Sequence, residues 1–230
     1  MPRATVLLLC CCGFLAGCAS HDIRVTAYLS QDLPFPTAGS ETRVGVVTKS
    51  SPEEPLLEAE VRRKIEWLLR QRGFEVGPLE ESDYLLTAFF AIDSGKTAIE
   101  AYPVYEPGRT ITSHYRTCRG RWVTRTTFLP GSTTYEPYRY TYFTRHLALT
   151  VYERQRWEEA GERDLAEVTV WRARAISRGP SADLRRIIDY LLVAAFEYFG
   201  EDTGRQVRET LRDGDQRAKT LRESYREDEP

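Results

Sequence analysis

The residues best suited to chemistry lie in a segment rich in arginine and aromatic side chains, residues 102–143. Between Glu106 and Glu136 the segment has no acidic residue but contains five arginines. Arginine forks pair bidentately with carboxylate or phosphate, and aromatic faces stack on sugars or cations. This composition predicts a contact surface; the alternative is a plain antiparallel hairpin, because Tyr and Thr favour strands. The candidate contact residues are Arg109, Tyr115, Arg116, Arg119, Arg121, Trp122, Arg125, Tyr138 and Tyr140.

Catalytic patterns are weaker. His114 and His146 belong to no His-Glu-x-x-His motif or Cys/His cluster, and neither a Gly-x-Ser-x-Gly motif nor a Gly-rich phosphate loop is present. The acids between Glu80 and Asp83 lie in an expected turn, where carboxylates are usually solvated. We therefore expect no enzymatic activity, no cofactor and no metal site. The alternative is an envelope hydrolase acting on glycan or peptide, which would have to assemble Asp83, His146 and Glu167 through the fold.

Leu15-Ala16-Gly17-Cys18 closes an apolar run that begins near Val6 and follows Arg3. This layout is typical of a secretory leader, and its end reads as a lipobox. We expect cleavage after residue 17 and lipidation of Cys18, since two or more acyl chains anchor a protein stably. Ordinary signal-peptide cleavage and an uncleaved anchor are the alternatives. The residue after Cys18 is not aspartate, which by analogy with enterobacterial lipoproteins points to the outer membrane.

Charge and cysteine usage limit the remaining function classes. The 230-residue chain has a net charge of −2, so its overall charge does not favour binding to nucleic acid. Processing would leave Cys118 as the only free thiol, which excludes an intramolecular disulfide or a thiolate metal site. We expect a periplasm-facing domain on a lipid tether, whose partners are the membrane and, by contact, peptidoglycan, lipopolysaccharide or an envelope protein.

The elements that must position these residues alternate irregularly. Strands are predicted at 21–29, 42–48, 74–76, 83–92, 147–152 and 165–176, and amphipathic helices at about 55–72 and 184–199. Because strands and helices do not alternate one by one, the pattern favours an α+β fold, with a mainly antiparallel sheet and two helices packed on one face. We predict one domain over 18–200, after a leader at 1–17. The charged tail 201–230 is expected to hold a peripheral helix near 205–212 and then disorder.

The order of these elements resembles a known group of proteins. A lipobox precedes a strand, a helix ends in Arg72-Gly73-Phe74, and a strand opens with Ser82-Asp83-Tyr84-Leu85-Leu86. A later strand, Val168 to Ala175, precedes a helix that ends in Phe196-Glu197-Tyr198-Phe199. Over residues 22–200 the chain resembles the bacterial envelope lipoproteins catalogued as domain of unknown function 4136. That resemblance implies a fold and an envelope location, and it implies no reaction.

Overall fold

A computed structural model describes residues 20–39, 42–160, 165 and 167–225. The expected leader and Cys18 lie outside the described residues. The chain divides into two compact units, unit 1 (up to 92, 144–178 and 183 onward) and unit 2 (93–143 and 179–182). The single domain expected over 18–200 stays a prediction, and within it the contacts set residues 93–143 apart from the rest. Residues 93–143 form their own unit because their strands pair with one another.

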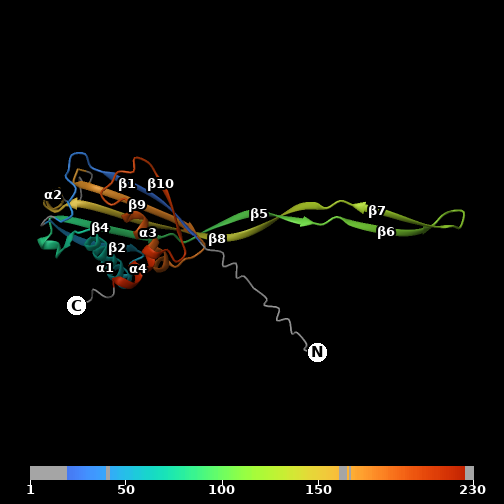
Figure 1. The fold of residues 1–230 in the computed structure, drawn as a ribbon, viewed down its shortest axis with the longest axis horizontal. Helices are drawn as coiled ribbons and strands as arrows, with labels where there is room; N and C mark the ends of the chain where they lie inside the picture. The colour runs from blue at the N-terminus through green and yellow to red at the C-terminus, as the bar shows by residue number, and fades with distance from the viewer. Residues whose placement is uncertain (1–19, 40–41, 161–164, 166, 226–230) are drawn as a thin grey trace, which may run out of the picture. The chain divides into compact units, whose positions relative to one another are not determined.

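Unit 1 is built on a mixed sheet, coloured from blue to orange in Figure 1. Its described strands follow the spatial order β10-β1-β9-β8-β4-β2-β3. The β1–β9, β1–β10 and β4–β8 pairs are antiparallel, whereas β2 pairs in parallel with β3 and β4. The bounds are β1 Ser20–Leu29, β2 Arg43–Ser51, β3 Glu75–Val76, β4 Tyr84–Ile92, β8 Ser132–Glu153, β9 Thr169–Gly179 and β10 Val207–Arg212.

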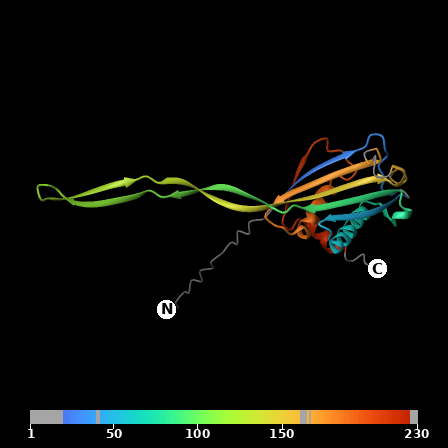
Figure 2. The ribbon, with the colours of Figure 1, turned by 180° about the vertical axis from the view of Figure 1, so that it is seen from behind.

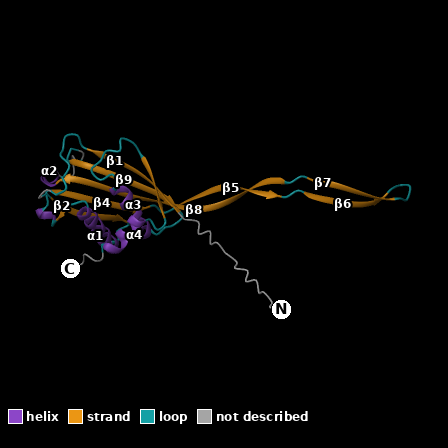
Figure 3. Cartoon of the chain, in the orientation of Figure 1, coloured by secondary structure: helices purple, strands orange, loops and turns teal. Residues whose placement is uncertain are grey.

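One face of this sheet is covered by helices α1 (Pro55–Gln71), α3 (Leu184–Phe196) and α4 (Gln216–Ser224), drawn in purple in Figure 3. Alternate residues of the strands, such as Val25, Leu149 and Ala173, are buried in one core with the helices' apolar stripes. The helix caps follow ordinary rules: Asp183 accepts from the Arg186 amide at 3.1 Å, and Gly73 after α1 has φ +80°. The α+β fold predicted from the sequence is confirmed.

The C-terminal segment differs from its prediction. The expected helix near 205–212 is strand β10, which pairs with β1 at the edge of the sheet. Val207 and Leu211 alternate with exposed Arg208 and Arg212, as in a strand. Pairing with β1 therefore determines the conformation of this segment, although its high charge content suggested a helix. Helix α4 then packs Leu221 and Ala218 into the core, so the segment up to 225 is ordered. Residues 226–230 lie outside the described part.

The remaining elements of unit 1 are short: a 3₁₀ turn η1 (Leu79–Glu81) and helix α2 (Arg154–Ala160). Within the described residues, every helix is too short or too polar to cross a lipid bilayer.

Unit 2 is a two-stranded antiparallel ribbon, which Figure 2 shows from behind. Strand β5 (Lys96–Glu106) pairs with residues 132–142 of β8. Strand β6 (Arg109–Arg116) pairs with β7 (Trp122–Leu129) around the turn at 117–121. The segment thus forms the hairpin that its Tyr and Thr content favours. No helix of unit 2 covers either face among its described residues.

Candidate functional site

The β6–β7 hairpin of unit 2 exposes nearly every side chain. Trp122 is 72% exposed and Phe128 is 66% exposed, beside the five arginines of the acid-free stretch. Large aromatic side chains normally bury their area or find a partner. A surface of arginine forks and uncovered rings is therefore suited to binding an anionic partner that also offers flat or apolar groups.

The strand register separates the predicted contact residues onto two faces. Residues directly opposite each other in an antiparallel pair share a face. Arg125 pairs with Ser113, which places it with Arg109 and Tyr115 on one face of the hairpin. Arg116 pairs with Trp122 on the opposite face. Arg119 and Arg121 lie in the connecting turn, where Thr117 Oγ1 accepts from the Arg121 amide at 3.3 Å.

The two predicted tyrosines lie on the other part of the ribbon, and their hydroxyl groups are occupied. Tyr138 stacks on Tyr140 with ring centroids 5.6 Å apart. Both hydroxyls donate to Glu100, that of Tyr138 at 3.0 Å. The hydrogen bond to Glu100 raises the pKa of Tyr140 to about 12. These tyrosines support the β5–β8 pair, so the contact surface is concentrated in the arginines and in Tyr115 and Trp122.

The structure does not bring together the residues of the hydrolase alternative. Asp83 precedes β4, and its side chain accepts from the Arg43 amide at 2.9 Å. Tyr84 pairs with Glu153, so His146 lies seven residues back along β8, roughly 23 Å away at ~3.3 Å per residue. A pocket of about 360 Å³ beside Asp83 contains neither His146 nor Glu167. The proposed catalytic group of these three residues does not form.

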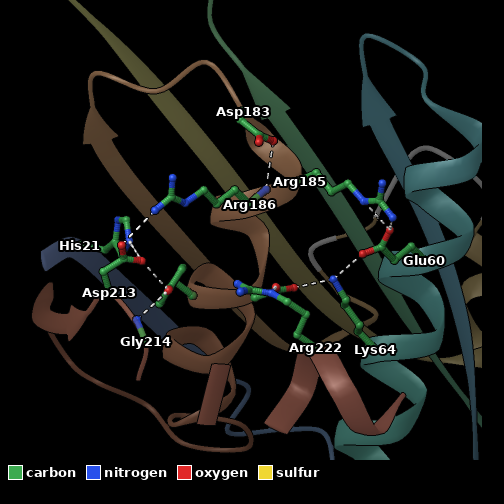
Figure 4. Close-up of polar contacts among 11 residues, drawn as sticks. His21, Glu60, Lys64, Asp183, Arg185, Arg186, Asp213, Gly214 and Arg222 are labelled. Atoms are coloured by element: carbon green, nitrogen blue, oxygen red, sulfur yellow. Dashed lines mark hydrogen bonds and ion pairs between the residues drawn. The ribbon is translucent and has the colours of Figure 1, made fainter. Parts of the chain in front are cut away.

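A buried charge network between α1, α3 and α4 was not expected from the sequence (Figure 4). Lys64 Nζ lies 2.6 Å from Glu60 Oε1 and 2.5 Å from Asp189 Oδ1, and Lys64 and Asp189 are each 1% exposed. Arg222 Nε donates to Asp189 Oδ2 at 2.9 Å, and Arg185 pairs with the second oxygen of Glu60. Burial alone would raise the pKa of Glu60, but Lys64 and Arg185 together lower it. Each of the three cations contacts at least one of the two carboxylates, so the network joins the three helices and presents no free nucleophile.

A second polar group in Figure 4 surrounds Asp213, between α3 and the end of β10. Asp213 accepts from the Tyr190 hydroxyl at 3.0 Å and pairs with Arg186 at 2.9 Å. His21 stacks against Tyr190 with ring centroids 4.2 Å apart. Burial lowers the pKa of His21, and the nearby Asp213 carboxylate opposes that effect. This group fixes the start of β1 to α3.

The other predicted chemical groups stay separate. His114 lies in β6, where its Nδ1 is 2.9 Å from Thr124 Oγ1, and Cys118 is an exposed free thiol in the turn. Across the described residues no three His, Cys, Asp or Glu side chains come together as a metal site.

Comparison with known proteins adds no assignment. No family model matches the chain, and no curated protein matches it. The resemblance to the lipoproteins of domain of unknown function 4136 rests on the residues quoted for it and stays a prediction.

Proposed function

We propose that this protein is a lipid-anchored envelope lipoprotein, facing the periplasm from the outer membrane, that binds an anionic envelope polymer through the β6–β7 hairpin. The observation that carries the proposal is the acid-free stretch between Glu106 and Glu136, whose five arginines stand on an exposed ribbon beside Tyr115 and Trp122. The lipobox ending in Cys18 supports the location.

The chemistry of the hairpin favours a glycan that carries phosphate or carboxylate groups. Arginine forks bind such groups bidentately, while Trp and Tyr rings stack on sugar faces. Lipopolysaccharide and peptidoglycan both offer this combination, and an acidic envelope protein offers the charge alone. Because Arg109, Tyr115 and Arg125 share one face and Arg116 and Trp122 the other, the hairpin can contact a polymer from either side.

Replacing Arg116, Arg119, Arg121 and Arg125 together with Ser is expected to lower retention on purified sacculi or lipopolysaccharide by at least about tenfold. The Ser variant loses four groups that can form charge-assisted hydrogen bonds to phosphate or carboxylate, and such bonds are roughly twice as strong as neutral ones. The measurement is co-sedimentation of the full chain with each polymer at two salt concentrations.

The matched control replaces the same four residues with Lys, which keeps the charge and removes the planar fork. Binding that survives in the Lys variant and falls with salt indicates a purely electrostatic surface; binding lost in both variants assigns it to the forks. Unchanged retention in the Ser variant would refute the contact surface. Circular dichroism of each variant checks that the ribbon still forms.

Cys18→Ser tests the anchor separately. We expect the variant to accumulate as unprocessed precursor or to leave the membrane fraction, because no acyl chain can then be attached at that position. The measurement is fractionation of cells with labelling by a fatty-acid probe. Normal processing, labelling and membrane retention in this variant would contradict lipidation at Cys18.

A further inference from the structure

The face of the unit 1 sheet opposite the helices displays a second concentration of arginine, independent of the ribbon. On β1, Arg24, Thr26 and Tyr28 alternate with the buried residues Val25 and Ala27. On β9, Arg172 and Arg174 alternate in the same way with Ala173 and Ala175. The outward side chains of these two central strands are therefore not part of the core.

The strand register brings these outward residues side by side. Tyr28 lies opposite Arg172, Thr26 opposite Arg174 and Arg24 opposite Ile176. Opposite residues in an antiparallel pair have Cβ atoms about 5 Å apart, and diagonal neighbours are still within reach of long side chains. Arg174 is thus next to Arg172 along β9 and diagonal to Arg24 across the pair, whereas Arg24 and Arg172 lie two pair positions apart.

A pocket of about 270 Å³ lies at this area. Its walls are formed by Arg24, Arg172 and Arg174 with Thr26, Tyr28 and Ile176, and Gln206 closes one side. The volume is just under the range of pockets that hold drug-sized ligands, so it suits a small group. The hydroxyl of Thr26 and the amide of Gln206 add neutral hydrogen-bonding groups, while Tyr28 and Ile176 add apolar surface.

The three arginines of the pocket carry more positive charge than the nearby carboxylate, Asp22, can offset. Within the part of the chain that the structure describes, the guanidinium groups of Arg24, Arg172 and Arg174 donate to no side chain or carbonyl group. Asp22, an acid on the same face, forms an ion pair with Arg208 and accepts a hydrogen bond from Thr210 Oγ1 at 3.0 Å. Arg208, which pairs with Asp22, lies opposite Arg24, so this edge of the pocket carries two guanidinium groups and one carboxylate. Like charges placed this close repel unless an anion sits among them.

We propose that this pocket binds the phosphate group of a small phosphate ester, with Arg24, Arg172 and Arg174 as its ligands and Tyr28 and Ile176 against the organic part. Three guanidinium groups that line one pocket exceed what a singly charged carboxylate needs and match the charge and the oxygens of phosphate. The phosphate can belong to a soluble ester or to a membrane lipid head group. The site lies wholly in unit 1 and does not depend on the ribbon's function.

The test uses the full chain, purified in a neutral detergent, and the double variant Arg172→Gln with Arg174→Gln. Titration with inorganic phosphate and with glycerol phosphate, followed by ³¹P NMR, is expected to show saturable binding that weakens at least about tenfold in the double variant. Arg70→Gln, at an exposed position of α1, is the matched control and should bind like the unchanged chain. Thermal unfolding of the variants checks that the sheet is intact.

Two further arms identify the source of the phosphate. The same proteins are mixed with vesicles of phosphatidylglycerol or of phosphatidylcholine. A preference for phosphatidylglycerol that the double variant loses assigns the site to lipid head groups, and binding of soluble phosphate without that preference assigns it to free esters. Chloride that competes as well as phosphate, or phosphate binding unchanged in the double variant, would overturn the proposal.

Discussion

Asp189→Asn is expected to lower the free energy of unfolding by about 3–5 kcal/mol, the usual effect of breaking a buried ion pair by removing one partner. The Asp189 side chain is 1% exposed and contacts both Lys64 Nζ and Arg222 Nε. The amide keeps the shape of the carboxylate and removes its charge. Lys64 would then remain buried with Glu60, which Arg185 already shares. Chemical denaturation of the full chain measures the loss.

Two controls separate this effect from general damage to α3. Replacing Lys64 with Met and Asp189 with Leu together should recover much of the lost stability, because an apolar replacement of a buried pair is often neutral or better. Arg62→Ala, which removes an exposed pair with Glu66, should change stability by no more than about 0.5 kcal/mol. An Asp189→Asn variant that unfolds with the same free energy as the original chain would show that the network contributes nothing net.

Trp171→Ala is expected to destabilise unit 1 by about 3–5 kcal/mol, as large aromatic deletions in a core do. Trp171 is fully buried on β9, and its ring packs edge-on against Phe199 with centroids 5.0 Å apart. Its indole Nε1 donates to the Glu201 carbonyl at 3.0 Å, which ties the chain after α3 to the sheet. Deleting the side chain removes the packing and leaves that carbonyl without its donor.

Trp171→Phe is the graded control, because it keeps one aromatic ring but loses the rest of the indole and the hydrogen bond, worth about 1 kcal/mol net, so its loss should lie below that of Trp171→Ala. Trp122→Ala, on the exposed hairpin of unit 2, should leave stability within about 0.5 kcal/mol. Equal losses from Trp171→Ala and Trp122→Ala in thermal and denaturant unfolding would contradict the placement of Trp171 at the centre of the core.

Elements with a strong period were predictable from the sequence, and those that depend on distant partners were not. The Leu and Ile spacing of α1 and the alternation of β1 and β9 reveal both the conformation and the buried face. Strand β10 was not predicted because its short run of alternating residues contains many charged side chains. Its strand conformation depends on pairing with β1. Pairing of that kind has no local signal.

The candidate sites show the same limit. The exposure of the arginine-rich hairpin agrees with its composition, but the division of its residues between two faces required the register. Lys64 lies buried in α1, because Asp189 and Glu60 supply its counter-charges. The one available sign was Asp189 itself, an acid inside an otherwise apolar helix, since such a group needs a buried partner.

The position of β1 governs the order in which unit 1 can fold. Both neighbours of this first strand, β9 and β10, come from the last third of the chain, and the contact between Asp22 and Thr210 spans 188 residues. As the chain emerges from its N-terminus, both edges of this strand therefore stay unpaired until residues 169–212 have emerged. Such long-range closure slows folding and leaves hydrogen-bonding edges open to other chains. An emerging chain of this protein thus has a long interval in which a chaperone that shields strand edges would raise its yield.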